Sequence, residues 1–190
     1  MEAELLTGAD RDEARITITK CHYAHSVSAG KSYYFSLGEA LVVYSIPANR
    51  NIGPYLLGCS DWPVWELSRL WAPDGHAPNL LTQAIAETAR ALREVENVVA
   101  LVSYADPNVG HDGAVYRAAS WVYLGQCEES RYYRLGNQVV SRRKFHSGPH
   151  GMRKADILAL GYTQLSLPGK HRYAKGLTKP ARKAIERRAG

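Results

Sequence analysis

Residues 64–104, VWELSRLWAPDGHAPNLLTQAIAETARALREVENVVALVSY, decide the fold of this chain. The stretch opens with aromatic and aliphatic residues over 64–71, which favour a buried strand. Pro78 and Asn79 form a helix start signal, and apolar residues then recur at helical spacing through about Glu96. The continuous apolar run over 98–104 is typical of a strand that is buried on both faces. Two strands joined by a helix predict an α/β fold with at least one parallel crossover.

The flanking segments extend this pattern in both directions. On the N-terminal side, residues 1–14 are expected to be frayed, and alternating Ile and Thr over 15–20 indicate a short strand. Further strands are predicted at 33–37, 40–46, 121–124, 131–135, 162–167 and 171–175, and further helices at 112–119, 152–160 and 179–188. From residue 64 onwards the order is strand, helix, strand, helix, strand, which is typical of an α/β fold.

Charge is distributed very unevenly along the chain. The 24 Lys and Arg against 18 Asp and Glu leave a net charge of +6. Residues 1–130 hold 9 basic and 16 acidic residues, a net of −7, whereas residues 131–190 hold 15 basic and 2 acidic residues, a net of +13. A basic segment on an acidic body is typical of binding to nucleic acid or another anionic surface. We expect a catalytic core over 1–136 and a small basic α+β appendage over 137–190.

The basic segment interleaves cations with aromatic residues. Arg and Lys neutralise phosphates, and Tyr can stack on an unpaired base, so the pattern favours binding to double-stranded DNA. A solvated surface is the ordinary alternative for such runs. The candidate DNA-binding residues are Arg131, Arg134, Arg142, Arg143, Lys144, Lys170, Arg172 and Tyr173.

Composition excludes several other classes of protein. A hydrophobic content of 45% is too high for a disordered chain, and no apolar run is long enough to span a bilayer. The acidic N-terminus lacks the features of a signal peptide. The three cysteines are widely spaced and form neither a disulfide framework nor a paired metal motif. These features predict a reduced, cytoplasmic protein without a membrane partner.

The densest group of functional side chains follows the strand at 98–104. Ser103, Tyr104, Asp106 and His111 lie where that strand ends and the next helix begins, which is where open α/β sheets bind ligands. Asp106 could orient or deprotonate His111, or accept a hydrogen bond from a substrate amine. The alternative is turn chemistry, because Asp-Pro-Asn-x-Gly is also a good loop sequence.

Two further groups could contribute to a site. On the strand at 64–71, alternation places Glu66 and Arg69 on opposite faces, where each must either form a structural ion pair or face a site. His22 and His25 would share one face of a helical turn, which makes them a candidate metal pair or acid–base pair.

The motifs together resemble those of the Mom family of bacteriophage DNA-modification proteins, which is considered related to the GNAT acyltransferase fold. The resemblance covers roughly residues 20–180, and Ser103-Tyr104-Ala105-Asp106 is its most specific part. The other matching pieces are Glu66-Leu67-Ser68-Arg69-Leu70, Asn79, Gly110-His111, Gly113, Tyr116-Arg117-Ala118, Trp121-Val122-Tyr123-Leu124-Gly125, His22-Tyr23 with His25-Ser26, and Lys170-His171-Arg172-Tyr173. The resemblance implies a GNAT-like mixed sheet.

The resemblance also implies an activity. Mom proteins attach a carbamoylmethyl group to the exocyclic amine of adenine in phage DNA, which protects that DNA from restriction inside the bacterial host. The group is joined through its methylene carbon, so simple acyl transfer cannot complete the reaction. The implied cofactors are an acyl-CoA-type donor such as acetyl-CoA, although the GNAT pyrophosphate loop has no good match over 71–82, and iron.

Site roles follow from the same resemblance. Asp106 would activate the adenine amine, Tyr104 or His111 would move its proton, and Arg69 would hold a carboxylate or phosphate of the small-molecule donor. The remaining assignments are Ser103 and Tyr23 as catalytic residues, Ser68, Asn79 and Tyr116 as donor-binding residues, and His22 and His25 as metal ligands. Two other functions remain open, an ordinary GNAT N-acetyltransferase of a protein or small amine and a non-enzymatic DNA-binding protein. Either a monomer or a homodimer is compatible with the sequence.

Overall fold

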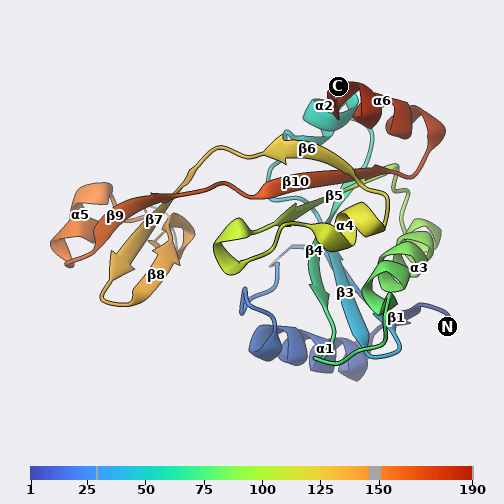
Figure 1. Cartoon of the computed structure of the whole chain (residues 1–190), viewed down its shortest axis with the longest axis horizontal. Helices are drawn as coiled ribbons and strands as arrows, with labels where there is room; N and C mark the ends of the chain where they lie inside the picture. Colours follow the sequence, from blue (N-terminus) through green and yellow to red (C-terminus); the bar gives the residue numbers. More distant parts are fainter. Residues whose placement is uncertain (29, 146–150, 190) are drawn as a thin grey trace.

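A seven-stranded sheet forms the centre of the molecule (Figure 1), as seen in a computed structural model that describes residues 1–28, 30–145 and 151–189, apart from the side chain of Arg143. The strand order is β1-β2-β3-β4-β5-β10-β6. The strands are β1 (Glu4–Leu6), β2 (Ser32–Leu37), β3 (Ala40–Ser45), β4 (Val64–Trp71), β5 (Ala100–Ala105), β6 (Val122–Gln126) and β10 (His171–Gly176). β4 and β5 run parallel and the other neighbours pair antiparallel. The expected mixed sheet and its parallel crossover are therefore confirmed.

Helices cover both faces of this sheet. The five helices that flank it are α1 (Gly8–Cys21), α2 (Ile52–Leu57), α3 (Leu80–Val95), α4 (Ala114–Ala118) and α6 (Lys179–Ala189). On one face, α3 and α4 bury their apolar residues against a core that includes Tyr44 and Leu101. On the other face, α2 and α6 pack against Ala100 and Val102, and α1 packs in a separate cluster on Val43. Successive side chains of a strand thus pack into the cores on opposite faces of the sheet, because side chains along a strand alternate between its two faces.

The N-terminal prediction was wrong. Residues 1–20 form β1 and most of α1 rather than a frayed end and a short strand. Ala14 and Ile18 lie four residues apart on one helix face and are buried against Tyr34 and Val43. The β-branched residues resembled a strand, but the energy of burying this face outweighs their weak intrinsic preference for strands.

A second, three-stranded sheet stands beside the main one. It has the order β8-β7-β9 and consists of β7 (Ser130–Leu135), β8 (Gln138–Ser141) and β9 (Thr163–Leu167). The 3₁₀ turn Arg142–Phe145 and the helix α5 (Lys154–Ala159) cover it with a small core of Tyr133, Phe145 and Ile157. Figure 1 shows this unit, which we call the small sheet unit, projecting from the main body.

The two sheets do not divide the chain at 136/137 as expected. β7 already belongs to the small sheet unit, and β10 returns to the main sheet between β5 and β6. α6 then packs on the main sheet. The basic C-terminal segment therefore supplies part of the main core as well as the small sheet unit. Within the described ranges, no helix is both long and apolar enough to cross a bilayer.

Candidate active site

The candidate site lies where β4 and β5 separate. The two strands pair from Val64 with Ala100 to Glu66 with Val102, and these fully described strands have no further paired residues. β4 also carries a bulge, because Leu67 and Arg69 face neighbouring residues of β3 and Ser68 is the extra residue between them. The expected strict alternation over 66–70 is therefore broken, and all five residues line the same cavity.

This cavity has a volume of about 1280 Å³. Its walls come from β4, β5, the loop after α1, the segment before α4 and the β6–β7 connection. The functional groups that line it are His22, Tyr23, Ser26, Asn49, Glu66, Ser68, Arg69, Ser103, Tyr104, His111, Asp112, Tyr116, Cys127, Glu128, Glu129, Ser130, Arg131, Tyr132, Ser141, Arg142, Lys170 and Arg172. The fold thus brings together most of the residues that the sequence singled out, from segments that are far apart in the chain.

Asp106 is buried beside the cavity and is held on both carboxylate oxygens. It does not line the cavity itself, but its neighbour Ala105 and its ion-pair partner Lys170 do. One oxygen accepts hydrogen bonds from the backbone N–H of Asn108 at 3.0 Å and from its side-chain amide at 2.9 Å. The other lies 3.1 Å from Lys170 Nζ. Burial alone would raise the pKa of Asp106, but Lys170 and Asn108 outweigh it and hold that pKa below its usual value. Turn chemistry and an ion pair are thus both present, and the carboxylate is ionised at neutral pH.

Arg69 joins the loop after α1 to the bulge of β4. Its Nε donates to the Ser26 carbonyl at 2.7 Å, Nη2 lies 3.3 Å from Ser26 Oγ, and Nη1 donates to the carbonyl of Ser68. These bonds use three of the five N–H groups of a guanidinium, which leaves two for a ligand. Burial lowers the pKa of Arg69, but an arginine stays charged throughout the physiological range.

Three aromatic rings, His22, Tyr23 and His111, form a cluster in the lining of the cavity. Tyr23 packs against His22 at 4.4 Å between ring centroids and against His111, edge to face, at 4.8 Å. Burial, then the charge of Arg69, lowers the pKa of His22 to about 4, so this imidazole is neutral at pH 7. Its Nδ1 accepts a hydrogen bond from the backbone N–H of Ala24 at 3.1 Å, which places the ring proton on Nε2. His22 is therefore a donor in this environment rather than a base.

Two tyrosines stand on the β5 side as neutral phenols. Burial and the nearby carboxylate of Glu66 raise the pKa of Tyr104 to about 12. Burial likewise raises the pKa of Tyr116 to about 12. Ser103 Oγ donates to the carbonyl of Leu67 at 2.7 Å and is hydrogen-bonded to the Tyr116 hydroxyl at 2.8 Å. Ser103 thus bridges β5 and β4 just beyond their last paired residues, which indicates that it supports the walls of the cavity.

The proposed metal pair does not form. His25 is exposed, does not line the cavity and has its Nδ1 3.2 Å from the Thr19 carbonyl. His22 has its Nδ1 engaged with Ala24. Among the described residues, no three His, Cys, Asp or Glu side chains come together as metal ligands would. These donors do not fit an iron ion, and we derive no step through one.

An acyl-CoA-type donor fits better. Leu81, in the first turn of α3, lines the cavity, and the first backbone N–H groups of a helix attract phosphates. Asn79 precedes this turn in a left-handed conformation but does not line the cavity, so the assignment of its side chain to donor binding has no support here. The free N–H groups of Arg69 stand at the same strand separation.

The DNA-binding candidates are distributed over different surfaces. Arg131, Arg142, Lys170 and Arg172 line the cavity, and Arg134 and Lys144 are exposed on the small sheet unit. The side chain of Arg143 lies outside the described part of the chain.

Tyr173, which was expected to contact DNA, is instead 1% exposed in the main core. Its hydroxyl donates to the Asp112 carbonyl at 2.7 Å and accepts from Arg117 at 2.8 Å. Gly113 accommodates the ring because a Cβ there would lie 2.2 Å from it. Tyr173 is therefore a structural residue.

Cys127 is a lining residue that sequence reasoning missed. Its Sγ lies 3.2 Å from Arg172 Nη2, and the Arg172 guanidinium in turn stands over the Tyr55 ring. A single cysteine just after a strand carries no motif. Only the pairing of β6 with β10 brings it to the cavity.

Sequence comparison relates the chain to one known family. The model of the family described as the Mom protein family matches residues 5–189. The methylcarbamoylase mom of Escherichia phage Mu is 24% identical over an alignment of 199 residues, which covers 95% of this chain and 82% of that protein.

Solved structures give low similarities. A Bacillus subtilis acetyltransferase in complex with CoA is 8% identical, with a TM-score of 0.46 and coverage of 93% of this chain and 99% of that one. The NatC complex bound to Gag peptide and CoA is 10% identical, with a TM-score of 0.45 and coverage of 94% of this chain and 100% of that one. A CoA-dependent acyl-homoserine lactone synthase, MesI, is 11% identical, with a TM-score of 0.45 and coverage of 98% of this chain and 94% of that one.

Proposed function

The chain belongs to the Mom protein family, and on that premise we propose that it is a DNA-modifying transferase of phage origin that acts inside the host cell. Its reaction adds a carbamoylmethyl group to the exocyclic amine of adenine. The observation that carries the proposal is the buried, ionised carboxylate of Asp106, which pairs with Lys170 beside an aromatic cavity that Arg131 and Arg142 also line. Cations in the lining suit a polyanion, and aromatic walls suit a base.

The target base enters the cavity outside the duplex. An exocyclic amine cannot be reached by a transferase while its base is stacked, so the nucleotide must be extruded. Tyr23 and Tyr132 offer aromatic surface in the cavity, on which any base can stack. Arg131 and Arg142 then neutralise phosphates beside the extruded nucleotide.

Asp106 accepts a hydrogen bond from the adenine amine. The lone pair of that amine is delocalised into the ring, and a carboxylate that accepts one of its N–H bonds makes the nitrogen more nucleophilic. Because the pKa of Asp106 is low, the group acts chiefly as an acceptor. His111 is the better candidate to receive the proton, because the raised pKa of Tyr104 makes that phenol a hydrogen-bond donor.

The donor lies between β4 and the start of α3. The free N–H groups of Arg69 hold its carboxylate or phosphate, and Ser68 and Tyr116 line its path. An acyl-CoA-type donor, when bound, would supply the carbon skeleton of the transferred group. The new bond runs from the amine nitrogen to a methylene carbon, so that carbon must carry a leaving group, which departs with the bonding electrons as the amine attacks and its proton passes to His111.

Mass spectrometry of nucleosides from DNA co-expressed with the protein tests the proposal. We expect a modified deoxyadenosine with the wild type and about a 100-fold or greater loss with Asp106→Asn, which keeps the shape of the side chain and removes its charge. Asp74→Asn is the matched control, because Asp74 is exposed and takes part in none of the ion pairs found among the described residues.

Two outcomes would contradict the proposal. An Asp106→Asn protein that folds and modifies DNA at the wild-type rate would remove Asp106 from the mechanism. The absence of any adduct with the wild type, together with acetylation of a peptide or small amine, would identify an ordinary acetyltransferase instead.

A further inference from the structure

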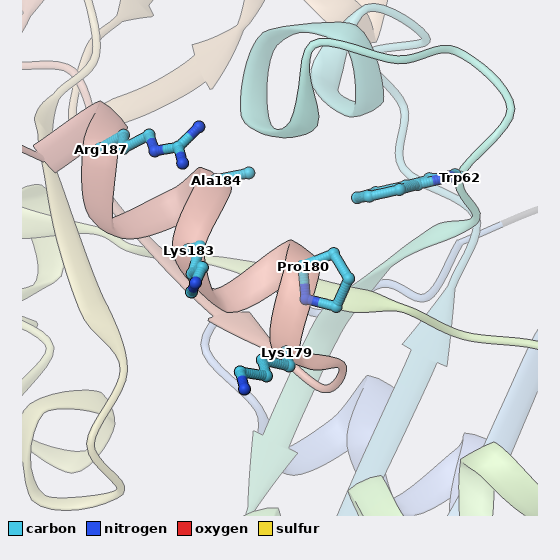
Figure 2. Close-up of a pocket in the computed structure, with 6 residues that line it drawn as sticks. All are labelled: Trp62, Lys179, Pro180, Lys183, Ala184 and Arg187. Atoms are coloured by element: carbon cyan, nitrogen blue, oxygen red, sulfur yellow. The ribbon is translucent and has the colours of Figure 1, made fainter.

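A second basic surface lies on α6, outside the candidate active site. Lys179, Lys183 and Arg187 recur every four residues along this helix, and all three are exposed. With Pro180, Ala184 and Trp62 they line a groove of about 410 Å³ that shares no lining residue with the cavity. Figure 2 shows the indole of Trp62 across from the helix, with Pro180 between it and the lysines. We call this surface the α6 groove.

The cations of the α6 groove stand on a rigid base and are available to a ligand. Ala181 and Ile185, on the inner side of the helix, are 0% exposed and pack on the main sheet. None of the ion pairs found among the described residues includes a residue of α6. The helix itself has a single acidic residue, Glu186, among five basic ones. A stable helix with this excess of positive charge is a surface for a polyanion.

The spacing of the row suits a nucleic-acid backbone. From Lys179 to Arg187 the helix rises about 12 Å, at 1.5 Å per residue. A strand of duplex DNA presents one phosphate per 3.4 Å of axis, so the row extends along roughly three to four phosphates. Trp62 supplies an apolar wall against which deoxyribose can pack.

The groove is connected to the cavity by stacked side chains. Arg188 of α6 lies over the Tyr55 ring at 4.4 Å, and its Nε donates to the Tyr55 carbonyl at 2.8 Å. Arg172 lies over the same ring at 4.7 Å and also lines the cavity. Positive charge therefore continues from α6 through Tyr55 to the wall of the candidate active site.

We propose that the α6 groove binds the sugar–phosphate backbone of duplex DNA while the target nucleotide occupies the cavity. This inference rests on the proposed function, since it takes the substrate to be DNA. It adds a binding surface on a second side of the molecule, separate from the small sheet unit. DNA that is bound by both the α6 groove and the small sheet unit is anchored on either side of the extruded base, which keeps the base from leaving the cavity.

Salt-dependent binding to a labelled 20-base-pair duplex tests this surface. The variant Lys179→Ala/Lys183→Ala/Arg187→Ala is expected to weaken binding at least tenfold near physiological salt and to lower the slope of log K against log salt by about 2 to 3. Arg15→Ala/Arg90→Ala/Arg93→Ala removes the same charge from exposed positions on α1 and α3, and we expect a slope close to that of the wild type. Thermal melting confirms that both variants are folded.

Fluorescence gives an independent readout. Trp62 is half-buried beside the groove, so bound DNA should change its emission. The difference spectrum on DNA addition is expected to be lost in Trp62→Phe and kept in Trp71→Phe.

The outcomes separate the two proposals. If the α6 variant binds duplex DNA as its control does, the groove inference is overturned and the proposed function stands. If the wild type itself fails to bind duplex DNA and leaves no adduct, the proposed function is overturned first.

Discussion

Residue environments decide which protonation states the candidate site offers. Asp106 is held ionised by Lys170 and Asn108, whereas His22 and Tyr104 are held neutral chiefly by burial. Asp106 therefore offers a charged acceptor beside the cavity, while His22 and Tyr104 in its lining offer neutral donors. This combination can hold an amine by its N–H without protonating it, which is what an attack by the amine nitrogen needs.

His22 should make the stability of the protein depend on pH. Its pKa is about 4 in the folded protein against about 6.5 in the unfolded chain, so the unfolded chain binds the proton more readily between these values. The stabilisation is complete above pH 6.5 and is lost as the pH falls towards 4. Relative to His22→Asn, which cannot titrate, the wild type should lose about 1–2 kcal/mol of unfolding free energy between pH 7 and pH 5. Urea unfolding at both pH values measures this, and identical pH dependences in the two proteins would contradict it.

The sequence could predict the location of a residue where neighbouring residues in the chain determine it. Ser103, Tyr104 and His111 reach the cavity because they end one strand and begin the next connection. Tyr173 could not be placed in this way. Its motif looks like a basic, aromatic DNA contact, and only the pairing of β10 between β5 and β6 buries it.

At the scale of elements, the separation of β4 from β5 produces the cavity. The bulge at Ser68 interrupts the regular course of β4, and the hydrogen bond from Ser103 Oγ to the Leu67 carbonyl joins the two strands just beyond their last paired residues. The sequence predicted both strands and the helix between them correctly. It could not predict the bulge, because an extra residue in one strand shows only when the partner strand is known.

The small sheet unit should be sensitive to its own core. Ile157 of α5 is 0% exposed against Tyr133 and Phe145, and Ile157→Ala should cost about 2–5 kcal/mol of the stability of this unit. Hydrogen exchange should then rise in β7 and β9 but not in β4 or β5. The control is Leu158→Ala on the same helix, which is 39% exposed and should change exchange little. Equal effects of the two variants, or faster exchange throughout the main sheet, would count against a separate core.

At the scale of the whole molecule, the uneven charge of the chain becomes a spatial arrangement. The basic segment from residue 131 onwards supplies cations to the small sheet unit, the cavity rim and α6. The sequence indicated a basic segment and a polyanionic partner. It could not show that part of this segment completes the main sheet, because β10 is more than sixty residues from β5 in the chain.

A chain that stops at Lys170 should therefore fail to fold rather than merely lose affinity for DNA. It lacks β10, so the backbone groups of β5 and β6 that pair with β10 have no hydrogen-bond partner. It also lacks the α6 residues that pack with α2 on the main sheet. We expect loss of the cooperative thermal transition in near-ultraviolet circular dichroism. Deletion of residues 1–7, which removes the edge strand β1, is the control and should lower Tm while the transition stays cooperative. A cooperative transition in the 1–170 chain would contradict this reading.

The position of β10 also has a consequence for biosynthesis. At 5–20 residues per second, the ribosome adds the segment between β5 and β10 in roughly 3 to 13 s. During that time, β5 waits with one edge unpaired, which exposes it to wrong partners and to chaperones. The main sheet closes only after its last strand has left the exit tunnel. A nascent chain that has not yet exposed β10 therefore lacks the complete main sheet and carries no assembled cavity.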